Sequence, residues 1–391
     1  MKVCGIVAEF NPFHNGHAYL LKAAAQQNDA VICVMSGNFV QRGDLALFEK
    51  SIRVEAALLN GADLVLELPV GYALSGAQNF AKGAMALLQG TGVVNTIAFG
   101  VEQNNTAALN RAAEWVRNPA IIEKTVARCR LGEAFAVART AVLREADLEA
   151  ASLLSQPNSI LAVEYLNACH SLSFHPEILP VLRCGAQHHD SVASGRFACA
   201  GALRKQIESE PVSAIFSYIP ENLQRLYQGA VAYQMKELET ALLFSLRGKK
   251  LSDFEQLPDL CAGLDRALFE AVRRETQFGA LVASVTGKRF PAARIRRLLL
   301  CCALGISNEY HQKAPPYLRV LGFRKEKEEL IRKIADKAAL PLLFRSSDPA
   351  LKDSFCRQTF ETEAETTDFY ALAGQPVLPC GTEYRRMPVK V

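Results

Sequence analysis

The residue types best suited to chemistry lie near the N-terminus, in the segment Phe10-Asn11-Pro12-Phe13-His14-Asn15-Gly16-His17, which follows an apolar run at residues 3–8. Gly16 has no Cβ, so a phosphate can approach the backbone closely, and a helix that starts there offers free N–H groups to an anion. His14 and His17 add donors where negative charge develops during attack on an α-phosphate. The segment predicts a nucleotide site, with a chance histidine pair or a metal site as the alternatives.

A polar loop is expected at residues 35–43, which read Met-Ser-Gly-Asn-Phe-Val-Gln-Arg-Gly. Its glycines, polar side chains and arginine suit a loop that closes over a substrate, and an ordinary surface loop is the alternative. Lys50 and Arg53 follow on a predicted helix, where they fit either solvated surface charges or phosphate contacts. We expect a structural role for Asp63, whereas Glu67 could cap a helix or bind Mg²⁺ through water.

Three further polar residues are expected near the same site. Asn158 opens a helix, where it could cap the helix or contact a nucleotide, and Arg183 follows a predicted strand beside a glycine, which suits a ribose or phosphate contact. Arg204 is the last residue of the segment 198–204, which contains Gly201 and is expected to begin a helix. The run His188-His189-Asp190 could form a metal cluster, but adjacent histidines point apart. We therefore predict no metal site.

A cluster of basic residues lies far downstream, at residues 288–297. The apolar residues Ile295, Leu298, Leu299 and Cys302 share one face of a predicted helix by their spacing. Arg296 and Arg297 fall on the opposite face, Arg294 lies at its margin, and Lys288 and Arg289 come just before it. No acidic residue interrupts the cluster, so we predict a patch that contacts the phosphate backbone of RNA. A solvated basic face is the alternative.

Apolar runs alternate with helical patterns through the first half of the chain. The strands are expected at residues 3–8, 30–35, 62–68, 93–99 and 176–182, and the helices between them at 16–26, 50–59, 77–88 and 157–169. Strands separated by helices of this length form right-handed βαβ units and a parallel sheet. Ligands bind such a sheet beyond the carboxyl ends of its strands, where the polar segments lie. The pattern predicts an α/β fold with a Rossmann-like parallel sheet.

The second half of the chain has a mainly helical pattern. Helices are expected at residues 220–227, 233–246, 261–275, 292–304 and 325–338, whereas the last forty residues have no clear period and no predicted structure. We therefore expect a catalytic, ATP-binding domain at residues 1–210 and a helical, basic RNA-binding domain at residues 211–391.

Composition restricts the class of protein. The chain has 391 residues, of which 50% are hydrophobic and 21% charged, so globular domains are expected rather than disorder. It lacks an apolar run long enough for a membrane span and a signal-peptide pattern, and its eleven cysteines show no CxxC spacing. We expect reduced thiols in a cytoplasmic protein with no membrane association. The net charge of +4 is small, so a nucleic-acid site must be a local patch.

Taken together, these segments resemble the bacterial tRNA(Met) cytidine acetate ligase family of the nucleotidylyltransferase-like superfamily. The resemblance rests on an ordered series of motifs: residues 7–17, 35–43, 64–69, 99–100, 157–161, 183–186 with 189–190, 294–297 and 316–323. It implies an enzyme that activates acetate with ATP to acetyl-adenylate and transfers acetyl to N4 of the wobble cytidine of elongator tRNA(Met). ATP would be a substrate, with Mg²⁺; no tightly bound cofactor and no obligate protein partner are implied.

The resemblance also implies site residues. His14 and His17 would be catalytic, and Arg204 would hold pyrophosphate, although residues 198–204 lack the Ser/Thr hydroxyls of the second signature of nucleotidylyltransferases. The full nucleotide-binding set would be Val7, Ala8, Glu9, Phe10, Asn11, Pro12, Phe13, His14, Asn15, Gly16, His17, Ala18, Tyr19, Leu20, Gly100, Asn158, Arg183 and Arg204.

Two other functions remain open from the residues alone. A small-molecule adenylyltransferase would share the nucleotide site, but such enzymes usually lack a large basic helical domain. A non-catalytic, nucleotide-gated RNA-binding protein would share both parts, and it would release no pyrophosphate from ATP and acetate. The residues themselves indicate nucleotide binding and a basic patch; acetate, cytidine and the particular tRNA depend on the resemblance.

Overall fold

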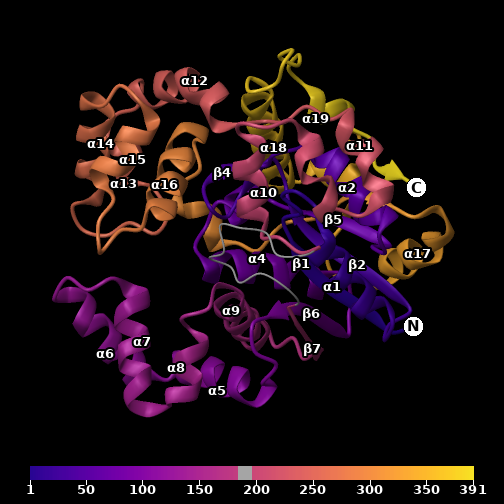
Figure 1. Cartoon of the computed structure of the whole chain (residues 1–391), viewed down its shortest axis with the longest axis horizontal. Helices are drawn as coiled ribbons and strands as arrows, with labels where there is room; N and C mark the ends of the chain where they lie inside the picture. The colour runs from indigo at the N-terminus through magenta and orange to yellow at the C-terminus, as the bar shows by residue number, and fades with distance from the viewer. Residues whose placement is uncertain (184–195) are drawn as a thin grey trace.

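The computed structural model describes residues 1–183 and 196–391, and a parallel sheet lies at its centre (Figure 1). Its core strands are β1 (Val3–Ala8), β2 (Ala30–Ser36), β5 (Leu64–Leu68), β6 (Thr96–Val101) and β7 (Glu177–Leu182). They pair in the order β5-β2-β1-β6-β7, and every pairing among them is parallel. The predicted Rossmann-like sheet is therefore confirmed.

Helices cover both faces of this sheet, because successive side chains of each strand point to opposite sides. Val34 and Leu66 pack with α4 (Ala77–Gly90) and α9 (Pro157–Ser171) on one face. Cys33 and Val65 belong to the cluster on the other face, which includes residues of α1 (Asn15–Ala25) and α2 (Lys50–Leu59). β2, whose residues are all buried, is almost continuously apolar, which is why the sequence revealed it, whereas β7 at the edge of the sheet is largely half-buried or exposed.

Three strands from the second half of the chain extend the sheet. β8 (Leu318–Phe323) pairs antiparallel with β5, and β10 (Val389–Lys390) and β9 (Leu342–Leu343) pair parallel with β8. Our expectation of a mainly helical second half did not include these strands. All six residues of β8 are buried, but the run contains Arg319 and Gly322, which interrupt the apolar pattern.

Two groups of helices project on the same side of the sheet, at the left of Figure 1. The first lies between β6 and α9 and comprises α5 (Thr106–Arg117), α6 (Pro119–Arg130), α7 (Phe135–Ala146) and α8 (Leu148–Leu153). The second comprises α12 (Met235–Arg247), α13 (Leu251–Glu255), α14 (Leu264–Arg274), α15 (Phe278–Val285) and α16 (Ala292–Leu304). The second group has its own apolar core, formed by residues such as Leu242, Leu268 and Leu298.

The last forty residues are structured, so the expectation of no structure there was wrong. They contain α18 (Ser354–Ala371), which starts at the N-cap Asp353, and α19 (Thr382–Arg385). The remaining short elements are β3 (Phe39–Val40), β4 (Asp44–Leu45), α3 (Val70–Ala73), α10 (Ala200–Ile207), α11 (Gln224–Gln228) and α17 (Glu328–Lys337). Among the described helices, none combines the length and apolar character needed to cross a bilayer.

Candidate active site

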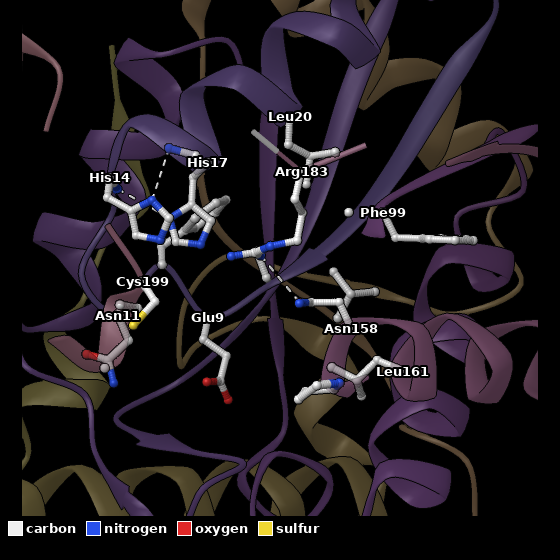
Figure 2. Close-up of a pocket in the computed structure, with 18 of the residues that line it drawn as sticks. Glu9, Asn11, His14, His17, Leu20, Phe99, Asn158, Leu161, Arg183 and Cys199 are labelled. Carbon is white, nitrogen blue, oxygen red and sulfur yellow. Dashed lines mark hydrogen bonds between the residues drawn. The ribbon is translucent and has the colours of Figure 1, made fainter. Parts of the chain in front are cut away.

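A cavity of about 700 Å³ opens at the carboxyl ends of β1, β6 and β7 (Figure 2). Segments far apart in the sequence form its walls. The predicted nucleotide-site residues that line it are Val7, Ala8, Glu9, Phe10, Asn11, His14, Gly16, His17, Tyr19, Leu20, Gly100, Asn158, Arg183 and Arg204. Its position is the one at which parallel α/β sheets bind ligands.

Four residues of the predicted set do not line this cavity: Pro12, Phe13, Asn15 and Ala18. The N–H of Phe13 donates to the hydroxyl of Tyr227 at 3.0 Å, and the Nδ2 of Asn15 donates to the carbonyl of Arg196 at 2.8 Å. Phe13 and Asn15 therefore anchor the histidine turn to residues outside the cavity.

His14 and His17 form a reciprocal cap at the start of α1. The Nδ1 of His14 accepts the N–H of Gly16 at 3.0 Å, and the Nδ1 of His17 accepts the N–H of His14 at 3.3 Å. The two rings stack with their centroids 3.9 Å apart, and Figure 2 shows them together on one wall of the cavity. A Cβ on Gly16 would lie 2.8 Å from Cε1 of His14, so glycine is required at this position.

The electrostatic surroundings keep both imidazoles neutral. Burial, followed by the charges of Arg183 and Arg204, lowers the pKa of His14 to about 3. Burial, then His14 and Arg183, lowers the pKa of His17 well below its ordinary value. Because each Nδ1 accepts a hydrogen bond, the proton of each neutral ring is on Nε2. The site therefore holds two preorganised Nε2–H donors.

Arg183 and Asn158 meet on another wall of the cavity, where the guanidinium NH1 donates to Oδ1 of Asn158 at 3.4 Å (Figure 2). The Nδ2 of Asn158 in turn donates to Glu102 at 2.6 Å, and Ser159 donates to the same carboxylate through its N–H and its hydroxyl. Burial raises the pKa of Glu102, but the hydrogen bonds from Asn158 and Ser159 outweigh it and lower the pKa overall. Glu102 thus fixes the orientation of Asn158.

The helix α10 completes the cavity with a thiol where the second signature of nucleotidylyltransferases has hydroxyls. Cys199 is the N-cap of α10, and its Sγ accepts the N–H of Ala202 at 3.4 Å. The NH1 of Arg204 donates to the carbonyl of Asn11 at 2.7 Å, which ties α10 to the histidine turn. The segment that departs from the signature therefore keeps a capped helix start and an arginine at the cavity.

Sequence reasoning missed several residues of the cavity wall. Gln41 and Arg42 lie at the tip of the β3–β4 hairpin, inside the polar loop at residues 35–43, so the loop was identified but these side chains were not assigned to the site. The other unassigned wall residues include Phe99, Leu161, Tyr165, Phe197 and Cys199. Phe99, Leu161 and Cys199 lie in segments that the sequence singled out, but apolar and thiol side chains resemble core residues and so were not assigned to the site.

The charged residues of α2 have neither of the roles considered for them. Lys50 is buried and pairs with Glu67 at 2.6 Å and with Glu383 at 2.9 Å. Arg53 is buried as well and donates to the carbonyls of Phe48, Glu9, Ser36 and Gly37. Both side chains are buried rather than surface charges; Arg53 holds the ends of β1 and β2, whereas Lys50 joins β5 to α19. Glu67, for which the sequence leaves two roles open, is buried as the ion-pair partner of Lys50.

Asp63 has the structural role expected of it. Its Oδ2 accepts the N–H of Val31 at 2.8 Å, and Arg324 and Lys327 lie 3.6 and 3.8 Å from its Oδ1. The run His188-His189-Asp190 lies outside the described residues, as do residues 184–186. Within residues 1–183 and 196–391, no three His, Cys, Asp or Glu side chains form a group that could hold a metal.

The basic residues around α16 divide into two kinds. Lys288 and Arg289 are exposed, just before the helix begins. Arg294, Arg296 and Arg297 are half-buried, and each donates to a carbonyl: Arg294 to Asp259, Arg296 to Arg42 and Arg297 to Gln41. The expected face of free arginines is therefore occupied in part by contacts with the cavity hairpin.

The chain is similar to a known family of nucleotidyl transferases over most of its length. The family HIGH Nucleotidyl Transferase matches residues 1–381, in agreement with the histidine turn, the parallel sheet and the cavity. A tRNA(Met) cytidine acetate ligase of Thermoanaerobacter sp. (strain X514) is 33% identical over 95% of this chain and 96% of its own length. That of Syntrophomonas wolfei is 34% identical over 95% of both chains. The chain belongs to the tRNA(Met) cytidine acetate ligase family.

Solved structures extend the likeness to three dimensions. Apo TmcAL of Thermotoga maritima superposes with a TM-score of 0.93 at 30% identity, and the match covers 100% of both chains. The same protein bound with alpha-thio ATP gives a TM-score of 0.91 at 28% identity, again over 100% of both chains. The two helical groups and the added strands therefore belong to the shared fold.

Proposed function

We propose that this protein activates acetate with ATP to acetyl-adenylate and transfers the acetyl group to N4 of the wobble cytidine of elongator tRNA(Met). One observation carries the proposal: His14, His17, Arg183 and Arg204 converge on one cavity, in a chain that matches a relative bound with alpha-thio ATP over its full length. The names of the curated relatives supply the acid and the tRNA.

The first step is attack of an acetate oxygen on the α-phosphorus of ATP. The bond between that phosphorus and its bridging oxygen breaks, and pyrophosphate leaves. Donors fixed in advance stabilise the charge that grows on the phosphate oxygens. The Nε2–H groups of His14 and His17 fill this role, Arg204 holds the pyrophosphate, and Arg183 and Asn158 hold the nucleotide.

The second step is attack of the cytidine N4 on the acetyl carbonyl. The bond to the AMP oxygen breaks, AMP leaves with the bonding pair, and N4 loses a proton. The reaction therefore consumes one ATP and one acetate for each acetylcytidine formed.

We propose that Mg²⁺ enters as the complex with ATP. Among the described residues that line the cavity, Glu9 supplies the carboxylate, and its Oε1 already accepts the N–H of Gln41 at 2.7 Å. These residues do not form a metal site of their own, so the ion would be held by phosphate oxygens.

We propose that RNA binds the helical group α12–α16, with Lys288 and Arg289 as its exposed phosphate contacts and the half-buried Arg294, Arg296 and Arg297 beside them. Activation belongs to residues 1–210 and RNA binding to residues 211–391, except that β8–β10 of the second part complete the sheet. Lys288→Ala with Arg289→Ala should weaken tRNA binding and lower its log–log salt slope by about one unit per lost contact. Arg332→Ala, at an exposed position of α17 outside this helical group, is the matched control.

An acid series tests the reaction itself. ATP–pyrophosphate exchange should require a small carboxylic acid and should be fastest with acetate, and tRNA(Met) should gain N4-acetylcytidine, read by mass spectrometry of its nucleosides. Exchange that needs phosphopantetheine or a mononucleotide would instead indicate a small-molecule adenylyltransferase. Binding of ATP and tRNA without any pyrophosphate release would indicate a non-catalytic protein.

A further inference from the structure

The backbone N–H and the backbone carbonyl of Gln41, at the wall of the cavity, are both hydrogen-bonded to side chains. Its N–H donates to Oε1 of Glu9 at 2.7 Å, and Glu9 follows β1 and lines the cavity. Its carbonyl accepts from NH1 of Arg297 at 2.9 Å, and Arg297 is on α16, 256 positions along the chain. The backbone of one residue, Gln41, thus connects a carboxylate of the cavity to the arginine helix.

The neighbouring residues of the hairpin repeat this attachment. The carbonyl of Arg42 accepts from Nε of Arg296 at 3.2 Å. Gly43 has φ +69°, and a Cβ there would lie 2.6 Å from the backbone nitrogen of Arg297 and 2.7 Å from Cβ of Arg296. Only glycine lets the hairpin tip adopt this conformation and approach α16 so closely.

Apolar and charged contacts join the same two elements. Phe39 and Leu45 of the hairpin belong to the apolar cluster that includes Ile295 and Leu298 of α16. Burial raises the pKa of Asp44, and the charges of Arg204 and Arg296 act against it. Asp44 therefore lies in the combined field of an arginine at the cavity and an arginine of α16.

We propose that Arg297 is a positioning residue for acetate activation: through the carbonyl of Gln41 it holds the hairpin tip that forms one wall of the cavity. The helix that carries the basic cluster thus has a role in the ATP chemistry as well as in RNA binding. Misplacing a wall that orients reacting groups lowers the rate of the chemical step more than it lowers nucleotide affinity. The catalytic part of this inference rests on the proposed function.

The test measures acetate-dependent ATP–pyrophosphate exchange without tRNA, together with hydrogen exchange of the amides of residues 38–45. Arg297→Ala should lower kcat by about tenfold or more, as expected for loss of a charged hydrogen bond, and leave KM for ATP within about twofold. The same variant should speed hydrogen exchange in the hairpin. Arg297→Lys, which can still donate to the carbonyl, should restore part of both losses, and Arg332→Ala, at an exposed position of α17 outside the helical group α12–α16, should change neither.

Gly43→Ala disrupts the same contact from the hairpin side, so it should reproduce the effects of Arg297→Ala, and the double variant should be little worse than either single one. It also keeps the test decisive if Arg297→Ala fails to fold. Unchanged hairpin protection in the folded variants would overturn the proposal, whatever their activity. If the wild-type protein shows no acetate-dependent exchange, the proposed function is wrong. Hydrogen exchange of the hairpin amides then tests by itself whether Arg297 positions the hairpin.

Discussion

The rings of His14 and His17 stack at 3.9 Å, and each accepts a backbone N–H of the turn that opens α1. This relationship sets the chemistry of both side chains. It assigns each Nδ1 to the cap, leaves the proton on Nε2, and holds the two donors in a fixed position beside the cavity. In the mechanism we propose, the two rings that cap α1 are also the donors that stabilise the transition state.

The two functions of His17 can be separated by substitution. His17→Asn retains an acceptor for the cap but lacks the reach of Nε2–H, so it should keep its fold and lower the rate of adenylate formation about 10²-fold. His17→Ala should show the same loss of rate and a further loss of stability of about 1 kcal/mol, typical of a lost cap. Single-turnover assays and denaturant unfolding measure the two effects. A normal rate of adenylate formation in both variants would remove His17 from the chemistry.

The low pKa of His14 predicts a dependence of stability on pH. The ring stays neutral in the folded protein down to about pH 3, whereas in the unfolded chain it titrates near its ordinary value. Between these pKa values the unfolded state binds the extra proton, so the free energy of unfolding falls as the pH falls. From pH 6.5 to 5 the contribution is about 2 kcal/mol.

His14→Asn removes this titration and keeps a residue type favoured at N-caps. Its unfolding free energy should therefore depend less on pH in the same window, as measured by denaturant unfolding at several pH values. Equal slopes for the variant and the wild type would show that His14 titrates normally in the folded protein.

Arg183 should contribute directly to ATP affinity. Arg183→Ala should weaken binding by about 1.5–3 kcal/mol, the range for a lost hydrogen bond to a charged group. Glu102→Gln should have a smaller effect, since it acts through the orientation of Asn158. Calorimetric titration measures both, with Arg128→Ala on the exposed face of α6 as the control. Unchanged affinity in a folded Arg183→Ala would make Arg183 a structural residue.

Cys199 offers a chemical probe of the same cavity. Its thiol lines the wall at the start of α10, so bound ATP should slow its alkylation. Cys380 is exposed and does not line the cavity, so its rate of alkylation serves as an internal control in the same sample. Peptide mapping after iodoacetamide treatment gives both rates. Equal labelling of Cys199 with and without ATP would place the nucleotide elsewhere.

The sequence was sufficient for elements whose pattern is local. The predicted strand at residues 3–8 and the predicted helices at 50–59 and 292–304 coincide with β1, α2 and α16. β8 could not be predicted in the same way, because its place beside β5 depends on a pairing with residues more than 250 positions earlier. Lys50 is buried for a similar reason: its partner Glu383 lies far along the chain.

The same division applies to the site. His14, Gly16 and His17 act within one turn, so their spacing was informative. The assignment of Arg296 and Arg297 to a free helix face used the helical period correctly, but the period cannot reveal that the hairpin tip at Gln41–Arg42 packs against that face. The features that could not be predicted from the sequence are those that depend on contacts between distant segments of the chain.

If the cavity makes acetyl-adenylate, that compound should be detectable before any tRNA is added. The protein is mixed with ATP and labelled acetate without tRNA, quenched within one turnover, and analysed by chromatography. We predict an enzyme-bound acetyl-adenylate that forms together with pyrophosphate and disappears when tRNA(Met) is added, as label enters the tRNA. Acetylation of the tRNA without any such intermediate, or no ATP consumption at all, would contradict the account.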